Sequence, residues 1–511
     1  MKGLARIVGA VAAGAALILA FPPYDLWFAA VVVTAGFALL VRGRSVWAAA
    51  ALGLSTGLGF FVPLLPWIGQ EVGPIPWLVL ALLQALFFAP LGVAVMLVQR
   101  LPGWPVWTAA AWVTEEALRG RVPYGGLTWG KLAFSQADGP MLGLASVGGS
   151  PLVSFAVALA GGLVAWAVVA RQVVARVTAV AAAAGVVAVG AVVPAPELGG
   201  PTITVAVVQG NVAELGLGFN DERRLITRNN AEVTARLADD VAAGREMQPD
   251  VVVWPENSVD INPYADAQTR AEVSRAVDAV AAPTLIGALV PTPDERNVEN
   301  TSIVWEPGSG AGQTYVKRHP MPFGEYIPFR RIARVITPAV DEQPRDFVAG
   351  QEVGLLDMGP ADVGAVICFE VAFDNLVRDA VRAGGDLVAV QTNNATFGFT
   401  PMTEQQLAMA RFRAVEHGRT VLVAALAGVS AIVGPDGGVR ERAELYTQDV
   451  LVADVGLSDR RTTATTIGEW PEWILVGTVA GATVLAVLRS RRRVGDQAGG
   501  TPTPAVTADV R

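Results

Sequence analysis

Cysteine is almost absent from this chain: Cys368 is the only one in 511 residues, and histidine occurs only at His319 and His417. A single cysteine excludes an intramolecular disulfide, and two histidines argue against a histidine-rich metal site. Charged residues are also scarce, at 16% against 52% hydrophobic residues, a composition too apolar for a purely soluble enzyme. The net charge of −8 argues against nucleic acid as a partner. No metal or nucleotide motif occurs, so we expect no cofactor.

The apolar residues are concentrated in two parts of the chain, whereas 201–457 has the mixed composition of a globular domain. Apolar runs of about 17–25 residues are typical of membrane-spanning helices. We therefore predict a seven-helix membrane domain over 1–195 and an eighth transmembrane helix over 471–489. The predicted spans are 4–21, 25–41, 46–65, 76–98, 104–119, 148–170, 174–193 and 471–488.

The first run also fits the apolar stretch of a signal peptide, but six further runs follow it, which favours an uncleaved helix. Short cytoplasmic loops are rich in Lys and Arg, so basic residues predict the orientation. With eight helices, a large set of basic residues beside helix ends lies on one side of the membrane, which is then the cytoplasmic side. The set comprises Lys2, Arg6, Arg42, Arg44, Arg100, Arg171, Arg176, Arg489, Arg491, Arg492 and Arg493. The globular domain is then expected outside the cytoplasm. The C-terminus is expected inside it, and 495–511 is predicted to be a disordered cytoplasmic tail.

One loop departs from this charge rule. The 119–140 segment carries Arg119, Arg121 and Lys131, yet the helix count assigns it to the outside. It is long and includes the aromatic run Tyr124-Gly125-Gly126-Leu127-Thr128-Trp129. We therefore expect it to dock against the globular domain.

Short β-branched runs alternate with helical patterns through the globular domain, which predicts an α/β layered sandwich. Catalytic groups in such folds gather where strands end, and Glu256 and Cys368 each lie just beyond an apolar strand. The expected strands are 202–209, 251–254, 285–290, 301–305, 313–317, 362–368, 387–391 and 420–426. The expected helices are 221–243, 266–280, 373–383 and 402–416.

A thiol needs a base to become a nucleophile, and a cation or donor to stabilise the oxyanion that it creates. Glu256 and Lys317 are candidates for these two tasks beside Cys368. Each residue also has a plainer interpretation when taken alone. Cys368 could be an inert core thiol, Glu256 a solvated loop acid, and Lys317 part of a surface charge cluster. Glu370 weakens the first of these, because a residue two positions along a strand points to the same face. Glu325 alone is equally a structural ion-pair partner.

The order of these motifs resembles the Glu-Lys-Cys signature of the nitrilase superfamily. It comprises Trp254-Pro255-Glu256, then Lys317 followed by Pro322-Phe323-Gly324-Glu325-Tyr326-Ile327-Pro328, then Cys368-Phe369-Glu370. The segment from Arg411 to Arg419 resembles the helix-to-strand segment of that fold. Flanked by apolar helices, with a Pro-Tyr-Gly-Gly loop at 123–126, such a domain is similar to the apolipoprotein N-acyltransferase family. The resemblance covers nearly the whole chain except the tail.

This resemblance implies a multi-pass α-helical membrane domain plus an extracytoplasmic α/β nitrilase-like domain, an αββα sandwich, over 201–457. It implies an acyltransferase in the plasma membrane of a bacterium. The enzyme would move an acyl chain from a phospholipid, through a Cys thioester, to the α-amino group of a diacylglyceryl-cysteine at a lipoprotein's N-terminus. Glu256 would be the general base, Lys317 the oxyanion stabiliser and Cys368 the nucleophile. Glu325, Glu370 and the backbone N–H of Phe369 would support them.

Aromatic positions near this signature are candidates for substrate contacts and for a lid that excludes water: Phe219, Phe323, Tyr124 and Trp129. The chain departs from the family pattern at Phe369, where Tyr is frequent, and at Phe219, where Trp is expected. It also has Asn394 and Thr396 where Asp and Trp often occur, and His319 and Met321 vary the lysine loop. These departures concern lid contacts and lipid or peptide preference, and they leave the triad intact.

Two other functions fit the same sequence. A membrane-tethered amidase of the nitrilase type would use the same triad on a soluble carbon–nitrogen substrate, and release of lysophospholipid would separate it from an acyltransferase. A non-catalytic outer binding module would tolerate replacement of Cys368. A transporter is disfavoured, because the helices hold few charges beyond Glu115 and Glu116. We expect a monomer whose partners are the membrane, the phospholipid donor and the lipoprotein acceptor.

Overall fold

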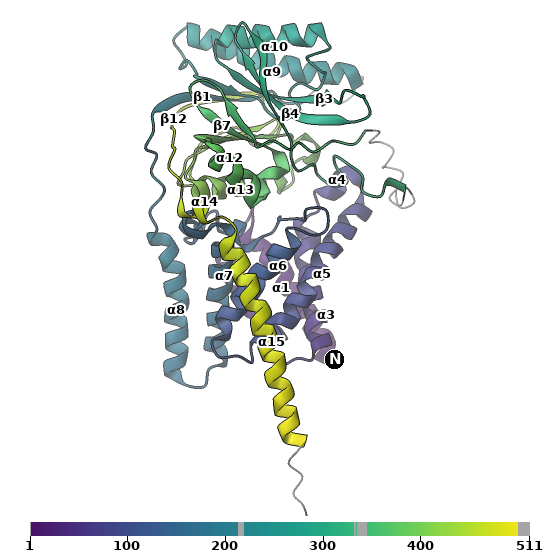
Figure 1. Cartoon of the computed structure of the whole chain (residues 1–511), viewed down its shortest axis with the longest axis vertical. Coiled ribbons are helices and arrows are strands. Elements are labelled where there is room, and N and C mark those ends of the chain that lie inside the picture. The colour runs from purple at the N-terminus through teal and green to yellow at the C-terminus, as the bar shows by residue number, and fades with distance from the viewer. Residues whose placement is uncertain (1, 213–218, 332–333, 335–344, 499–511) are drawn as a thin grey trace, which may run out of the picture.

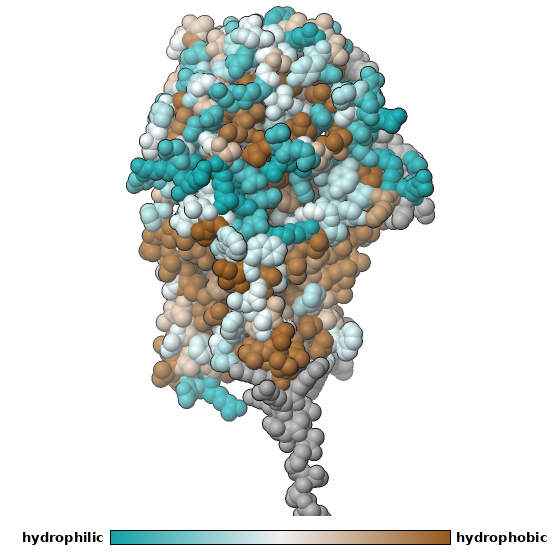
Figure 2. All heavy atoms as spheres, in the orientation of Figure 1, coloured by the Kyte–Doolittle hydropathy of each residue, from teal (hydrophilic) through white to brown (hydrophobic). Residues whose placement is uncertain are grey.

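The computed structural model describes residues 2–212, 219–331, 334 and 345–498 in two regions stacked along the long axis of the molecule (Figure 1). A bundle of apolar helices forms the lower region, and two sheets with their covering helices form the upper one. On the face seen in Figure 2, a broad hydrophobic band covers the bundle, and hydrophilic side chains gather over the upper region. The fold is therefore a membrane-type helical region joined to an α/β region.

Each predicted span contains a helix. Among the described residues, six helical segments are long and apolar enough to cross a membrane, whereas α2 is shorter and α6 carries the acid pair Glu115 and Glu116. The helices are α1 (Lys2–Leu17), α2 (Phe28–Val41), α3 (Val46–Leu64), α5 (Pro74–Val98), α6 (Trp104–Arg119), α7 (Ala145–Val169), α8 (Val173–Val192) and α15 (Trp470–Ala498). Helix α15 continues into the predicted tail, whose remainder, 499–511, lies outside the described residues.

Small residues let the helices of the bundle approach closely. At Gly53 of α3, an added Cβ would lie 2.0 Å from the carbonyl oxygen of Phe88 on α5. Because lipid tails are as apolar as the helices, packing of this kind, rather than the hydrophobic effect, holds such bundles together. The short helix α4 (Ile68–Val72) rises from this bundle toward the α/β region.

In the part of the α/β region that the structure describes, there are two mixed sheets of six strands each. The first has the order β12-β1-β2-β3-β4-β5, built from β1 (Thr202–Gln209), β2 (Val251–Val253), β3 (Thr284–Pro291), β4 (Val298–Glu306), β5 (Gly310–Val316) and β12 (Asp449–Gly456). The second has the order β11-β10-β9-β8-β7-β6, built from β6 (Leu355–Asp357), β7 (Asp362–Ile367), β8 (Leu387–Thr392), β9 (Val421–Ala425), β10 (Ala431–Val433) and β11 (Val439–Arg442).

The two sheets pack face to face around an apolar core that includes Val205, Leu285 and Ile367. Helices α9 (Phe219–Ala242) and α10 (Ala267–Val280) cover the outer face of the first sheet. Helices α12 (Asp374–Ala383) and α13 (Met402–His417) cover the second. This is the expected αββα sandwich. One continuous apolar cluster joins α12 and α13 to the membrane-type helices, so the second helical layer lies on the bundle (Figure 1).

Candidate active site

The only thiol lies at the point where β7 ends. The strand stops at Ile367, and Cys368 begins the 3₁₀ turn η5 (Cys368–Ala372) with φ of +52°. A positive φ is rare for a residue with a side chain, and such strain persists only where the surrounding structure enforces it. The expectation that 368–370 continues the strand was therefore wrong, because the backbone turns sharply at the cysteine. Cys368 remains partly exposed.

Glu256 follows β2 and lies almost fully buried beside this turn. Its carboxylate accepts hydrogen bonds from Asn300 Nδ2 at 2.7 Å and from the backbone N–H of Asn393 at 2.7 Å. Its Oε1 atom is 3.4 Å from Lys317 Nζ. Two neutral donors and one cation therefore hold the carboxylate in a single orientation.

Lys317 follows β5, and its ammonium group is buried between two carboxylates. Nζ lies 2.9 Å from Glu325 Oε1, and Glu325 also accepts from Asn300 Nδ2 at 3.0 Å and from the backbone N–H of Met321 at 2.7 Å. Glu325 thus fixes both the lysine and the loop that follows it. The structure brings Glu256, Lys317 and Glu325 together, as the sequence order suggested.

The charges of the site favour a neutral thiol beside a charged lysine. Burial lowers the pKa of Lys317, but the carboxylates of Glu325 and Glu256 outweigh it and leave that pKa above its ordinary value. Burial, and then the Glu256 carboxylate, raise the pKa of the Cys368 thiol to about 12. At neutral pH the sulfur therefore keeps its proton, and a nucleophile forms only when a nearby base removes it.

Glu370 braces the turn from inside the protein. Its fully buried carboxylate accepts hydrogen bonds from the hydroxyl of Tyr315 and from the backbone N–H groups of Ile367, Arg318 and His319, all at 2.8–3.0 Å. The carboxylate therefore ties the nucleophile turn to the lysine loop. Contrary to the expectation from the sequence, Glu370 does not share a strand face with the thiol, because the strand ends at Ile367.

Several polar residues of the site had no signal in the sequence. Asn300 lies within β4, Asn393 follows β8, and Gln406 lies on α13, with its Nε2 atom 3.9 Å from Cys368 Sγ. Asn394 is buried and donates from Nδ2 to Gln406 Oε1 at 2.9 Å. This departure from the family pattern therefore orients the Gln406 amide beside the sulfur of Cys368. Such amides become recognisable only once strands distant in sequence are aligned.

The four aromatic candidates for substrate contact lie in different surroundings. Tyr124 and Phe323 are 43% and 51% exposed on loops beside the lysine segment. Trp129 is 1% exposed, stacks on Phe369 with ring centroids 6.0 Å apart, and donates from Nε1 to Gln405 at 2.7 Å. The loop between α6 and α7 therefore docks on the α/β region, as expected. Phe219 begins α9, and its side chain lies outside the described residues.

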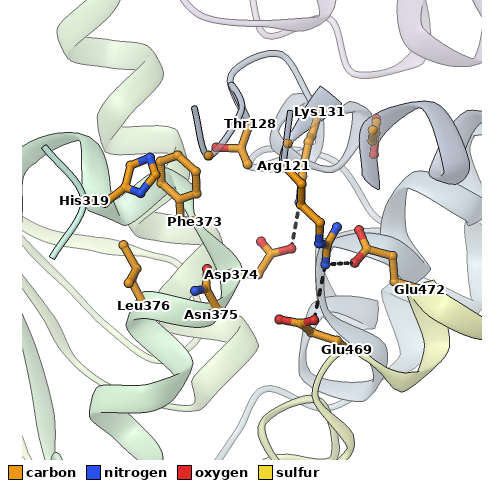
Figure 3. A pocket seen from close by; sticks show the side chains of 13 residues that line it. Arg121, Thr128, Lys131, His319, Phe373, Asp374, Asn375, Leu376, Glu469 and Glu472 are labelled. Atoms are coloured by element: carbon orange, nitrogen blue, oxygen red, sulfur yellow. Dashed lines mark hydrogen bonds and ion pairs between the residues drawn. The ribbon is translucent and has the colours of Figure 1, made fainter. Parts of the chain in front are cut away.

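A polar cavity of about 240 Å³ lies at the seam between the two regions (Figure 3). Arg121 and Lys131 reach it from the docked loop, Asp374 from α12, and Glu472 from α15. Glu256, Lys317 and Cys368 do not line it, so the cavity is separate from the thiol. Among the described residues, no group of three or more His, Cys, Asp or Glu side chains is placed to hold a metal ion.

The arrangement combines a thiol, a buried base and a buried cation. These are the components of covalent catalysis at a carbonyl carbon, in which the base activates the nucleophile and the cation stabilises the oxyanion. The strained turn presents the sulfur beside both groups.

Comparisons with known proteins cover both regions. The family model described as "Apolipoprotein N-acyltransferase N-terminal domain" matches residues 13–163, and the one described as "Carbon-nitrogen hydrolase" matches 204–465. A protein of Mycolicibacterium smegmatis named apolipoprotein N-acyltransferase is 39% identical over 508 residues, which cover 94% of this chain and 85% of the relative. One of that name from Azotobacter vinelandii is 30% identical, over 98% of this chain and 97% of the relative.

The chain is also similar to a solved structure. A mutant amidase of the nitrilase superfamily from Nesterenkonia is 18% identical, and the match covers 53% of this chain and 95% of the amidase with a TM-score of 0.39.

Proposed function

The chain belongs to the apolipoprotein N-acyltransferase family, and from that premise we propose that it acylates lipoproteins through a thioester on Cys368. It is a bacterial membrane protein and an acyltransferase of the nitrilase superfamily. The acyl donor in this proposal is a membrane phospholipid, and the acceptor is the α-amino group of an N-terminal diacylglyceryl-cysteine. The observation that carries the proposal is the buried group of Glu256, Lys317 and Glu325 beside the strained Cys368.

In the first half-reaction, Glu256 removes the thiol proton and the sulfur attacks the ester carbonyl of the phospholipid. The oxyanion that forms is opposed by the Lys317 ammonium and the backbone N–H of Phe369, each contributing about 3 kcal/mol. When the carbon–oxygen bond breaks, the lysophospholipid alkoxide takes the proton from Glu256. The products are a thioester on Cys368 and a neutral lysophospholipid alcohol.

In the second half-reaction, the neutral α-amine of the lipoprotein attacks the thioester carbonyl. The same cation and N–H oppose the second oxyanion, and Glu256 accepts a proton from the amine. The carbon–sulfur bond then breaks, the amide is released, and the proton returns to the sulfur. Dividing one acyl transfer into two steps lowers the barrier of each. Glu325 holds Lys317 in position throughout, and Glu370 holds the turn.

In this proposal the site faces the outer surface of the membrane. The basic loops predicted to be cytoplasmic and the α/β region lie at opposite ends of the bundle, as the N-terminus and the connection between α7 and α8 illustrate (Figure 1). This arrangement supports the proposal that the catalytic region lies outside the cytoplasm and the C-terminus inside it. We also propose that the protein acts as a monomer without a nucleic-acid partner. Exposed Tyr124 and Phe323 are the proposed contacts for entering lipid.

A reconstituted assay with both substrates tests this function. The purified protein in phospholipid vesicles is given a synthetic peptide whose N-terminal cysteine carries a diacylglyceryl group. We expect one amide-linked acyl chain on the peptide and one lysophospholipid released per turnover. Acceptor peptide that stays unmodified, together with hydrolysis of a simple amide by the same preparation, would instead identify an amidase.

A further inference from the structure

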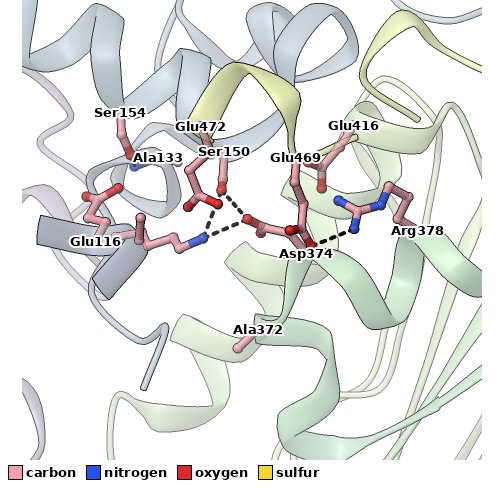
Figure 4. A network of polar contacts seen from close by, with 12 residues as sticks. Glu116, Ala133, Ser150, Ser154, Ala372, Asp374, Arg378, Glu416, Glu469 and Glu472 are labelled. Carbon is pink, nitrogen blue, oxygen red and sulfur yellow. Dashed lines mark hydrogen bonds and ion pairs between the residues drawn. The ribbon is translucent and has the colours of Figure 1, made fainter. Parts of the chain in front are cut away.

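A buried cluster of charged side chains lies behind the nucleophile turn, where the two regions meet. Its members in direct contact are Arg413 and Glu416 of α13, Asp374 at the start of α12, and Lys131 of the docked loop. Figure 4 shows Ser150 of α7 facing Asp374 across this seam. None of these residues belongs to the proposed triad.

Arg413 holds the far end of the turn that begins with Cys368. Its fully buried guanidinium donates from Nε to the carbonyl oxygen of Val371 at 2.8 Å and from Nη2 to that of Ala372 at 2.9 Å. Val371 and Ala372 are the last two residues of η5. Because Glu370 fixes the opposite side of the same turn, the strained backbone at Cys368 lies between two buried anchors.

The guanidinium is itself positioned by two acids. Asp374 Oδ1 lies 2.7 Å from Nη2, and Glu416 pairs with Nη1. His417 lies beside Glu416, but burial lowers its pKa well below the usual value, so it adds no positive charge. Within the α/β region, the contacting group therefore holds two acidic side chains and one basic one. Burial raises the pKa of Glu416, which shows that the second negative charge is costly in this place without another cation.

The membrane-type region supplies the missing charge. Lys131 is 4% exposed, and its Nζ lies 2.7 Å from Asp374 Oδ2 and 3.0 Å from Ser150 Oγ, while Ser150 donates to the same carboxylate oxygen at 2.7 Å. At Gly149, the α7 backbone comes so close that an added Cβ would lie 2.5 Å from Glu416 Oε1. Both acids that orient Arg413 therefore touch the helical region.

We propose that Arg413 is a positioning residue for the nucleophile turn, and that Lys131 completes its charge balance, so that the turn adopts its reactive geometry only when the helical region is docked. The inference rests on the proposed role of Cys368 as nucleophile. Membrane attachment then does more than bring the enzyme near its lipids, because the α/β region lacks one of the charges that hold its own site in place.

The test compares Lys131→Met, which removes the charge at similar length, with Lys131→Met/Asp374→Asn, which restores the balance. Arg411→Met is the matched control, because Arg411 pairs with Asp138 across the same seam but does not contact η5. Two rates are measured on each full-length protein in vesicles: acyl transfer, and alkylation of the single cysteine by iodoacetamide, followed by intact mass.

For Lys131→Met we expect kcat for acyl transfer to fall about tenfold or more with KM within about twofold, since the residue touches no substrate. Alkylation should become at least about threefold faster, because the relaxed turn exposes the thiol. Its time course should be a single exponential, which shows that all molecules react at the new rate and not only an unfolded fraction. The double variant should return both rates to within about threefold of wild type, and Arg411→Met should leave both unchanged.

The proposal is overturned if the double variant is no better than Lys131→Met, or if Arg411→Met causes the same loss. It is also overturned if the loss appears in KM alone. If wild-type protein transfers no acyl chain while alkylation still follows the charge balance, the proposed function fails and the positioning role stands.

Discussion

The helical bundle and the α/β region are specified by different interactions. In the bundle, contact depends on shape: Gly53 of α3 lies against the backbone of Phe88 with no space for a methyl group. In the α/β region, the site depends on buried charges, such as Lys317 between two carboxylates and Glu370 within a ring of donors. A close-packed helical bundle and a strained polar site are therefore joined in one molecule by a charged loop, which includes Lys131.

Replacement of the proposed general base should have the largest effect on the polar site. We expect Glu256→Gln to lower acyl transfer about 10²–10⁴-fold, because the thiol then keeps its proton. The same change should speed alkylation of Cys368 by iodoacetamide a few-fold at pH 9, because removing the carboxylate charge lowers the pKa of the sulfur, which burial and Glu256 together raise. Two effects of opposite sign would confirm the base. If both rates fell together, the variant would merely have damaged the fold.

Removal of the buried cation should have the next largest effect. Lys317→Met is expected to lower acyl transfer about 10²–10³-fold, the usual loss for one oxyanion donor. The partners Glu256 and Glu325 also lose their counter-charge, so the thermal unfolding temperature in detergent should fall. Arg245→Met, which removes an exposed pair with Asp240, is the control and should change neither quantity. Unchanged acyl transfer in Lys317→Met would remove the lysine from the mechanism.

The brace inside the turn should affect stability as well as activity. In Glu370→Gln, one carboxylate oxygen is replaced by an NH2 group, which donates and cannot accept. The buried donors facing it, either the backbone N–H groups of Arg318 and His319 or that of Ile367, then lose their partner. The expected loss in free energy of unfolding is about 3 kcal/mol. Denaturant unfolding of the detergent-solubilised protein measures it. A change below about 0.5 kcal/mol would show that the turn does not depend on this carboxylate.

Two glycine substitutions test whether close backbone packing stabilises the helical bundle. Gly53→Ala should destabilise the protein by about 1–3 kcal/mol, because the methyl group meets the backbone of Phe88. Gly36→Ala is the matched control on α2, where an added Cβ has nothing within 4 Å. Neither change should alter the alkylation rate of Cys368. Equal stability of the two variants would argue against packing by shape in the bundle.

Much of the architecture was readable from the sequence, because apolar run length and β-branched strands report burial directly. The predicted strand 202–209 coincides with β1, and the predicted helix 402–416 with α13. The prediction missed β6, β10, β11 and β12. Of these, β11 is exposed throughout. Strand β12 has an apolar run of only four residues, Val450 to Ala453, and is mostly half-buried, although it pairs antiparallel with β1 from Thr202 to Gln209. Such edge strands are defined by their partners.

Some residues of the site could likewise be predicted from the sequence, and others only from the fold. The proximity of Glu256, Lys317 and Cys368 could be predicted because each follows a recognisable strand in a known order, whereas their catalytic roles stay a prediction. Asn300 could not, since it meets Glu256 only through the alignment of β4 with the neighbouring strands. Local reasoning also failed at Glu370, because nothing in an apolar run reveals that the backbone turns at Cys368. The positive φ there depends on contacts from distant segments.

The most direct measurement is the intact mass of the detergent-purified protein after incubation with phospholipid and no acceptor, beside Cys368→Ala. The account predicts a mass increase of one acyl chain on the wild-type protein, removed by hydroxylamine and absent from the variant. Folded wild-type protein that gains no acyl mass from any of several phospholipids would contradict the thioester on Cys368, and with it the proposed route of acyl transfer.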